Sequence, residues 1–140
     1  MRIVIIGCGR IGAHVARSLA ASGHGVCVVD SEPASLVRLG DGYRGRTVVG
    51  AGFDETVLRE ARVQDADAVA VLTNVDATNF MVARAVVELF RVERAKVTVR
   101  VNDPEFAPLY ADLGLPALDL PDLVLEHVRG GLAAAGDTRT

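Results

Sequence analysis

Three glycines stand in the segment GCGRIG, at Gly7, Gly9 and Gly12, between a short apolar run and a stretch with helical periodicity. The first glycine permits a tight strand-to-helix turn, the second lets the backbone approach a pyrophosphate, and the third lets the helix pack closely on the strand. The helix that follows offers free N–H groups and the positive end of its dipole. We therefore predict a nucleotide site at this turn, which also includes Cys8 and Ile11.

An acidic residue stands at the end of the second apolar run, at the distance from the glycine segment that is typical of a nucleotide site. Asp30 stands 18 residues past Gly12, where an acid can accept hydrogen bonds from both ribose hydroxyls and repel a 2′-phosphate. The next residues, Ser31 and Glu32, add no arginine to offset that repulsion. We therefore expect NAD(H) or an adenine nucleotide such as ATP or ADP, and not NADP(H). The alternative is a glycine-rich turn with an acid that only caps a helix.

Two arginines lie where a positive charge is unexpected. Arg10 falls at the start of a helix, where the dipole disfavours a cation, and contact with phosphate oxygens would offset this cost. The alternative for Arg10 is a solvated arginine. Arg100 lies inside the apolar run VTVRV, where an unpaired charge is costly. We expect Arg100 to have a partner, either a neighbouring carboxylate or the ligand.

Two further segments follow apolar runs that we predict to be strands. Ligands of open α/β sheets bind at the carboxyl ends of the strands. Gly50, Ala51 and Gly52 follow the third run and would form the adenine side of the pocket. Thr73 and Asn74 follow the fourth run and would lie near the second phosphate or the second ribose.

The elements that must position these residues alternate along the whole chain. Six short runs are apolar at consecutive positions, as in parallel strands covered on both faces. These runs are residues 3–6, 26–29, 47–49, 68–72, 97–101 and, more weakly, 117–120. Amphipathic stretches separate them, so we predict an α/β fold, a Rossmann doubly wound parallel six-stranded sheet with helices on both faces.

Helix start signals stand at several of the expected positions. Pro33 suits the first turn of one helix, and Asp54, Asp76 and Asp103 can cap three others, the last of which Gly114 closes. After these, a short helix and a frayed tail are expected within residues 122–140.

Two of the expected helices carry more apolar residues than packing on a sheet requires. We interpret the excess as a protein–protein interface beside the fourth and fifth strands, the alternative being deep burial in a small domain. The residues are Phe80, Met81, Val82, Val86, Val87, Leu89 and Phe90 of the long helix, and Phe106, Leu109, Tyr110 and Leu113 of the next. In the last short helix, Leu123, Val124 and Val128 lie along one side.

Composition narrows the class of protein. A chain of 140 residues that is 50% hydrophobic and 24% charged fits one soluble globular domain. A net charge of -3 without a basic run argues against nucleic acid or an anionic membrane surface as partner. Cys8 and Cys27 lack metal-ligand spacing and indicate reduced thiols in the cytosol. No apolar stretch reaches the ~20 residues of a membrane span, so no direct insertion is expected.

At this point the motifs resemble a known family. The segments IIGCGRIG, VVD, VVGAG, DETVLREARVQDADAVAVLTNVDATNFMVARA and VRVNDPEFAPLYADLGL are similar to the TrkA-N domain, also called the RCK N-lobe or KTN domain. The likeness covers residues 1–121, and TNVDATN followed by VNDPE is its most specific part.

The resemblance implies a regulatory domain that binds NAD(H), ATP or ADP and controls potassium channels or transporters. It implies a cytoplasmic homodimer, which in this family can be part of a larger ring, that reaches the inner face of the membrane through its membrane partner. Gly7, Gly9, Arg10, Gly12 and Asp30 match the ligand-binding positions of the family. The other motif residues that match are Thr73, Asn74, Asp76, Asn79 and Arg100.

The sequence departs from the family pattern in two places. The family commonly has an acid where this chain has Ala51, and after Asp122 we expect a short helix in place of the C-lobe of full-length members. In some members an acid near the position of Asp122 or Glu126 binds a divalent cation between subunits, but a helix cap explains Asp122 more simply, and no metal is expected.

Catalytic residues are scarce in the sequence. His14, His24, His127 and Lys96 suit structural or solvated positions, and no nucleophile stands with a base. We therefore expect no catalytic site, and a ligand-sensing domain rather than an enzyme. The alternatives are a small NAD-dependent oxidoreductase and a nucleotide-binding regulator of a process other than ion transport.

Overall fold

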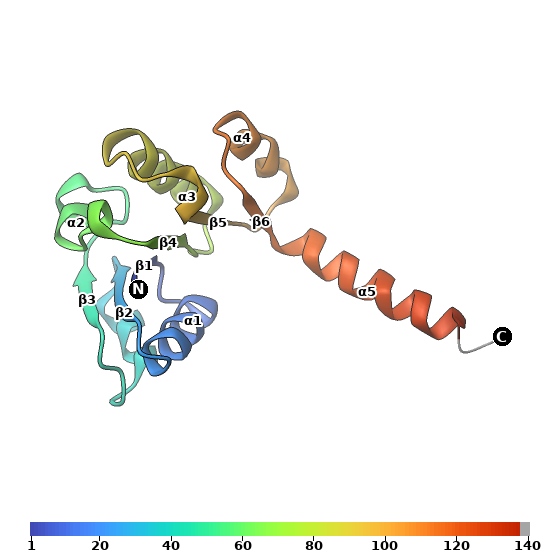
Figure 1. The fold of residues 1–140 in the computed structure, drawn as a ribbon, viewed down its shortest axis with the longest axis horizontal. Coiled ribbons are helices and arrows are strands. Elements are labelled where there is room, and N and C mark those ends of the chain that lie inside the picture. Colours follow the sequence, from blue (N-terminus) through green and yellow to red (C-terminus); the bar gives the residue numbers. More distant parts are fainter. Residues whose placement is uncertain (138–140) are drawn as a thin grey trace.

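A single six-stranded parallel sheet organises the chain in the computed structural model, which describes residues 1–137 (Figure 1). The strand order is β3-β2-β1-β4-β5-β6. This order confirms the predicted doubly wound Rossmann sheet, in which the chain moves outward in one direction from β1 and then in the other from β4. The strands are β1 (Arg2–Ile6), β2 (Gly25–Asp30), β3 (Arg46–Val49), β4 (Ala68–Val71), β5 (Val97–Val101) and β6 (Ala117–Asp119).

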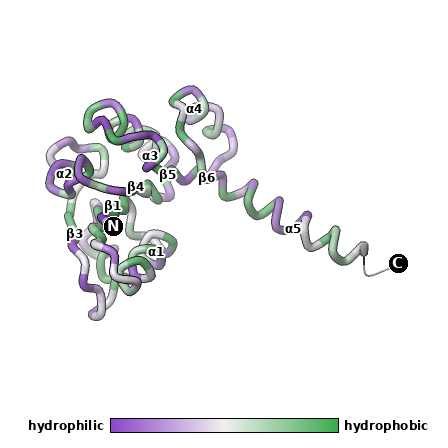
Figure 2. Tube along the Cα trace, in the orientation of Figure 1, coloured by the Kyte–Doolittle hydropathy of each residue, from purple (hydrophilic) through white to green (hydrophobic). Residues whose placement is uncertain are grey.

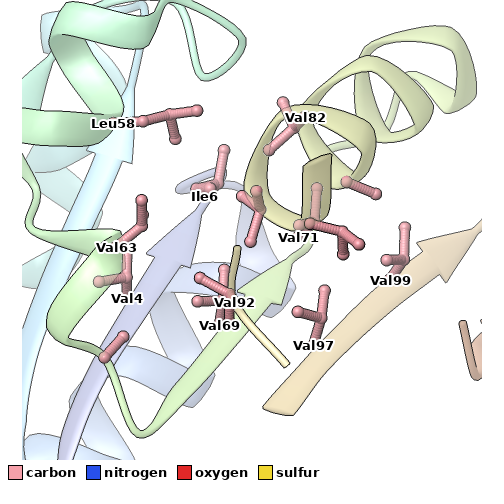
Figure 3. Close-up of a cluster of buried hydrophobic side chains, with 14 of the residues drawn as sticks. Val4, Ile6, Leu58, Val63, Val69, Val71, Val82, Val92, Val97 and Val99 are labelled. Atoms are coloured by element: carbon pink, nitrogen blue, oxygen red, sulfur yellow. The ribbon is translucent and has the colours of Figure 1, made fainter. Parts of the chain in front are cut away.

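The two faces of the sheet are buried under different helices because successive side chains of a strand point to opposite faces. Ile3 and Ile5 of β1 pack in the cluster beneath α1 (Arg10–Ala21) and the 3-10 helix η1 (Pro33–Leu39). Val4 and Ile6 pack on the other face, beneath α2 (Glu55–Glu60) and α3 (Asp76–Arg84) (Figure 3). Burial on both faces explains why the strands are apolar at consecutive positions.

Two of the expected helix starts have the predicted capping bonds. The Asp54 carboxylate accepts from the Thr56 N–H at 2.8 Å, and the Asp103 carboxylate accepts from the Glu105 N–H at 3.0 Å. Asp103 begins the 3-10 helix η5 (Pro104–Phe106), which leads into α4 (Ala107–Asp112). Pro33 opens η1, which is a 3-10 helix rather than an α-helix.

The prediction that Asp76 caps the long helix is wrong. The N-cap of α3 is Val75, and no side chain of residues 1–137 caps this helix start. The Asp76 carboxylate instead accepts from the backbone N–H groups of Asn102 at 2.8 Å and Asp103 at 2.9 Å. The Asp76 carboxylate therefore bonds to the loop after β5 and not to the first N–H groups of its own helix. The two donors in that loop lie 26 and 27 residues further along the chain.

The long helix also changes its winding. A π-helical segment, η3 (Ala85–Leu89), continues α3 and ends at Phe90. Val86 and Val87 of this segment face the core, where their exposed fractions are 0% and 5%. Three short 3-10 segments lie outside the sheet-packing helices: η2 (Val63–Asp65), η4 (Arg94–Lys96) and η5.

The C-terminal helix differs from the short helix and frayed tail that we expected. Helix α5 (Leu120–Asp137) has 18 residues, starts directly after β6, and leads away from the sheet (Figure 1). Residues 138–140 of the expected tail lie outside the described residues. The body of the domain therefore covers almost none of the surface of α5.

Candidate nucleotide-binding site

The glycine-rich turn between β1 and α1 has the geometry that its sequence predicts. Gly7 adopts a φ of +107°, and a Cβ at this residue would lie 2.8 Å from the Thr73 backbone nitrogen. A Cβ at Gly12 would overlap the Gly7 carbonyl oxygen. A Cβ at Gly9 would have no atom of the described residues within 4 Å beyond its own chain neighbours, so the backbone is open there to an incoming group.

The start of α1 is free of protein caps. Its N-cap is Gly9, and within residues 1–137 no side chain accepts from its first N–H groups and no acidic residue lies in the first turn. Arg10 is exposed, and its side chain forms no hydrogen bond or ion pair within the same residues. Free N–H donors at a helix start, together with a free guanidinium, suit an anion such as a phosphate.

Asp30 ends β2 and is fixed by the backbone of two neighbouring segments. Its Oδ2 accepts from the Cys8 N–H at 2.8 Å, and its Oδ1 accepts from the Glu32 N–H at 2.8 Å. Each carboxylate oxygen can accept a further hydrogen bond. The acid is therefore oriented beside the glycine-rich turn with acceptor capacity left for ligand hydroxyls.

A pocket of about 860 Å³ lies along the carboxyl ends of the central strands. It spans the point where the strand order reverses between β1 and β4, which is where ligands of open α/β sheets bind. Its size falls within the range of pockets that hold small molecules and cofactors.

Ten of the thirteen predicted site residues line this pocket. They are Gly9, Arg10, Ile11, Asp30, Ser31, Ala51, Gly52, Thr73, Asn74 and Arg100. The other three, Gly7, Cys8 and Gly12, are buried behind it and shape the turn. Burial, assisted by the nearby Asp30 carboxylate, raises the pKa of the Cys8 thiol, so this side chain stays protonated and neutral at pH 7.

Several pocket residues were missed by sequence reasoning. Arg38 of η1 lines the pocket and donates from Nη1 to the Cys8 carbonyl at 3.3 Å, which brings a second cation to the Asp30 side. The remaining missed polar residues are Glu32, Ser35 and Thr78, and the apolar ones are Ile6, Val29, Phe53, Leu72 and Val75. The short helix after β2 could have suggested Ser35 and Arg38, because its turns face the end of that strand.

The sequence predicts a partner for Arg100, either a neighbouring carboxylate or the ligand. Within the described residues its hydrogen-bond partners are neutral acceptors. Its Nε donates to the Asn102 side-chain oxygen at 2.6 Å, and its Nη1 lies 3.4 Å from the Leu72 carbonyl. No carboxylate in residues 1–137 forms an ion pair with it. The charge of Arg100 therefore stays available to the pocket.

A buried amide supports the far side of the pocket. Asn79 is fully buried, and its Nδ2 donates to the Thr73 carbonyl at 2.9 Å and to the Arg100 carbonyl at 3.0 Å. Its Oδ1 accepts from the Thr73 N–H at 3.2 Å. Asn79 thus joins the ends of β4 and β5 and positions Thr73 and Arg100 from behind the pocket wall.

The candidate catalytic residues do not converge. His14, His127 and Lys96 are exposed and His24 is half-buried, and all four lie away from the lining of the pocket.

Within the described part of the chain, no three His, Cys, Asp or Glu side chains are grouped as a metal site requires. The Asp122 N–H donates to the Asp119 carboxylate at 3.0 Å at the start of α5.

The strand order, the glycine turn and the acid at the end of β2 define a Rossmann-type domain. The chain belongs to the TrkA-N domain family, whose model matches residues 3–119. It is 44% identical over 118 residues to the Trk system potassium uptake protein TrkA of Streptomyces coelicolor, and this match covers 84% of the chain and 52% of that relative. TrkA of Vibrio alginolyticus is 33% identical over 76% of the chain and 23% of its own length.

Solved structures share the fold. The GsuK channel bound to NAD has a TM-score of 0.72 at 22% identity, over 85% of this chain and 21% of that one. The Kef C-terminal domain of Shewanella denitrificans in its AMP-bound form has a TM-score of 0.70 at 20% identity, over 96% and 82%. The chain spans about half or less of the TrkA relatives described above. No helix within residues 1–137 has the length and apolar character to cross a bilayer.

Proposed function

We propose that this chain is the nucleotide-sensing part of a potassium transport system, and that its ligand is NAD(H) or an adenine nucleotide, ATP or ADP. The pocket that joins the free start of α1 to Asp30 carries this proposal. The TrkA names of its relatives and the NAD in the GsuK structure support it.

The pocket offers complementary groups to each part of such a ligand. The N–H groups at the start of α1 and the Arg10 guanidinium would receive the phosphates. Asp30 would accept hydrogen bonds from the ribose hydroxyls, and Arg38 would lie on the same side. Ala51, Gly52 and Phe53 would contact the adenine, where the small side chain of Ala51 replaces the acid common in the family.

Binding would act through a shift between conformations rather than through chemistry. A ligand can move such an equilibrium only as far as its affinities for the two states differ. Arg100 and Thr73 line the pocket and are tied through Asn79 to the ends of β4 and β5. Contacts at the pocket would therefore bias how β5, α4 and α5 sit relative to the rest of the sheet.

The assembly would be a homodimer, alone or within a larger ring, that contacts a membrane potassium channel or transporter subunit at the inner face of the membrane. Most of the apolar residues of α3 and η3 fill the core, but Met81 and Leu89 remain exposed, and so does Leu109 of α4. Helix α5 adds Leu125 and Val128, whose exposed fractions are 43% and 51%. These surfaces support an interface on this side of the domain.

Titration calorimetry with NAD, NADH, ADP and ATP tests the ligand proposal. We expect Asp30→Ala to weaken the nucleotide that binds by about tenfold or more, since two hydrogen bonds to a charged acceptor would be lost. Asp41→Ala removes an acid outside the pocket and serves as the matched control. Because the Asp30 carboxylate also accepts two backbone bonds, circular dichroism must show that the variant is folded.

Asp30→Asn keeps one side-chain acceptor and provides a second, milder variant. Equal affinities of the original chain and of both Asp30 variants for all four nucleotides would contradict the proposal. Mass spectrometry of the denatured protein would identify a nucleotide that co-purifies. Turnover of NADH with a small substrate would favour the oxidoreductase alternative instead.

A further inference from the structure

A second pocket lies at the opposite edge of the sheet from the nucleotide site. Its volume is about 280 Å³, and it is formed by the amino ends of β1, β2 and β3 with the end of α2. We call it the amino-edge pocket. Its walls carry four arginines, Arg2, Arg44, Arg46 and Arg62, together with His24.

The charge of this pocket is one-sided. No aspartate or glutamate among the described residues lines it, although the chain has 18 acidic residues and a net charge of -3. Clefts lined by one sign of charge and backed by apolar walls concentrate counter-ions. The apolar wall here includes Ile3, Val26 and Cys27, all of them buried. Burial raises the pKa of the Cys27 thiol, so the wall stays neutral at pH 7.

Two of the four arginines have partners within the chain. Arg46 donates from Nη2 to the Glu60 carbonyl at 2.9 Å, and so caps the C-terminal end of α2. Arg62 forms an ion pair with Asp65 at 3.0 Å. These contacts explain Arg46 and Arg62 as structural residues and fix the positions of their guanidinium groups.

The other two arginines are not neutralised. Within residues 1–137, neither Arg2 nor Arg44 forms an ion pair with a carboxylate. Arg44 lies at the boundary with a neighbouring hollow of about 370 Å³ that Arg17 also lines. A helix-capping role therefore accounts for only part of the positive charge that gathers at this edge.

We propose that the amino-edge pocket binds a small organic anion with at least two negative charges, such as a phosphate ester or a di- or tricarboxylate. Guanidinium groups match carboxylate and phosphate oxygens in forked pairs. The volume is about a third of that of the nucleotide pocket, which excludes a dinucleotide. This second site is independent of the proposed nucleotide function, because the two pockets are lined by different residues throughout the described part of the chain.

Calorimetric titration of the full chain with citrate and with inorganic phosphate tests the second site. Sodium chloride at the same ionic strength separates specific binding from screening. We expect saturable binding of at least one of the two probes below about 10 mM, a range typical of weak anion sites. Arg44→Gln should weaken it by about tenfold, and the double variant Arg2→Gln with Arg44→Gln should remove it.

Arg129→Gln, on the exposed surface of α5, is the matched control because it removes the same charge from a residue outside the pocket lining. It should change the affinity by less than about twofold. Saturation with NAD, a dinucleotide too large for this pocket, should leave the binding of citrate and phosphate unchanged, and Arg44→Gln should keep its affinity for nucleotide. No saturable binding of either probe, displacement of the probe by NAD, or an equal loss in Arg129→Gln would overturn the proposal.

Discussion

The three glycines in the turn after β1 differ in why a side chain is absent. Gly7 and Gly12 are required by close contacts within the protein, because a side chain at either would meet backbone atoms of Thr73 or Gly7. Gly9 faces the pocket with free space around it. The same motif therefore contains residues whose small size the fold requires and a residue, Gly9, whose small size packing within the described residues does not require.

A matched pair of substitutions separates these two kinds of glycine. We expect Gly12→Ala to lower the free energy of unfolding by about 2–4 kcal/mol, since the added methyl group overlaps a backbone carbonyl that cannot move freely. Gly9→Ala should cost less than about 1 kcal/mol, because its φ of -77° suits alanine and the space around it is open. Urea unfolding followed by circular dichroism measures both.

Gly9→Ala, which should fold nearly as stably as the original chain, should nevertheless lose affinity for nucleotide. Gly9→Ala places a methyl group between the turn and the approaching phosphates, so its nucleotide affinity should fall by about tenfold or more. If Gly9→Ala binds nucleotides as the original chain does, then close approach of the ligand to this backbone is wrong.

At the scale of elements, the long helix after β4 is anchored by residues that its sequence pattern does not reveal. The π segment η3 continues this helix, and the loop after β5 bonds to the Asp76 carboxylate at its start. Tyr110 of α4 is fully buried and meets the Phe80 ring edge-on, with ring centres 5.7 Å apart. Burial, with a smaller contribution from the Asp76 carboxylate, raises the pKa of Tyr110 to about 12.

This raised pKa predicts how stability depends on pH. Unfolded tyrosine has a pKa near 10, so the folded chain keeps its phenol proton to a higher pH than the unfolded chain does. The stabilisation is complete below about pH 10 and is lost as the pH rises toward 12. We expect Tyr110→Phe, which keeps the contact with Phe80, to lose less stability over this range, by about 2 kcal/mol.

Urea unfolding at several values between pH 9 and pH 11.5 measures this difference. Tyr43, whose pKa is also raised by burial, is present in both proteins, so its contribution cancels in the comparison. Parallel stability curves for the two proteins would show that the Tyr110 phenol does not titrate above its usual range.

For the whole molecule, α5 is the element that the rest of the described residues cover least. Its apolar and polar residues alternate along an exposed rod, as Figure 2 shows. The stability of helices in proteins comes mainly from a packed apolar face rather than from helix propensity. Gly130 and Gly131 lower the intrinsic helix propensity further. We therefore expect a partner surface to stabilise this helix.

We expect the chain to form dimers that depend on this helix. Replacing both Leu125 and Val128 with serine should weaken dimerisation by about tenfold or more, because each apolar side chain contributes roughly 1.5–3 kcal/mol when buried. Light scattering coupled to gel filtration over a range of concentrations measures the effect, with Arg129→Ala as a control on the same helix. A monomer at all concentrations, with or without nucleotide, would contradict the dimer.

Much of the fold and part of the site follow from local sequence. Consecutive apolar positions predict the six strands, because both faces of a parallel sheet are covered, and the glycine spacing with Asp30 predicts the turn and the acid beside it. Asp76 shows why local reasoning fails elsewhere. An acid before a helix is an ordinary cap, but a loop 26 residues later supplies stronger partners.

Tertiary structure alone determined the features that depend on distant segments. Arg38 lines the nucleotide pocket, Asn79 joins two strand ends, and four arginines from three segments of the chain share one pocket at the other edge. The spacing of residues in the sequence does not predict these contacts between distant segments, because they depend on the order of the strands in the sheet. By itself the sequence determined the Rossmann sheet and the glycine-rich turn that faces the pocket, because both depend on residues close together in the chain.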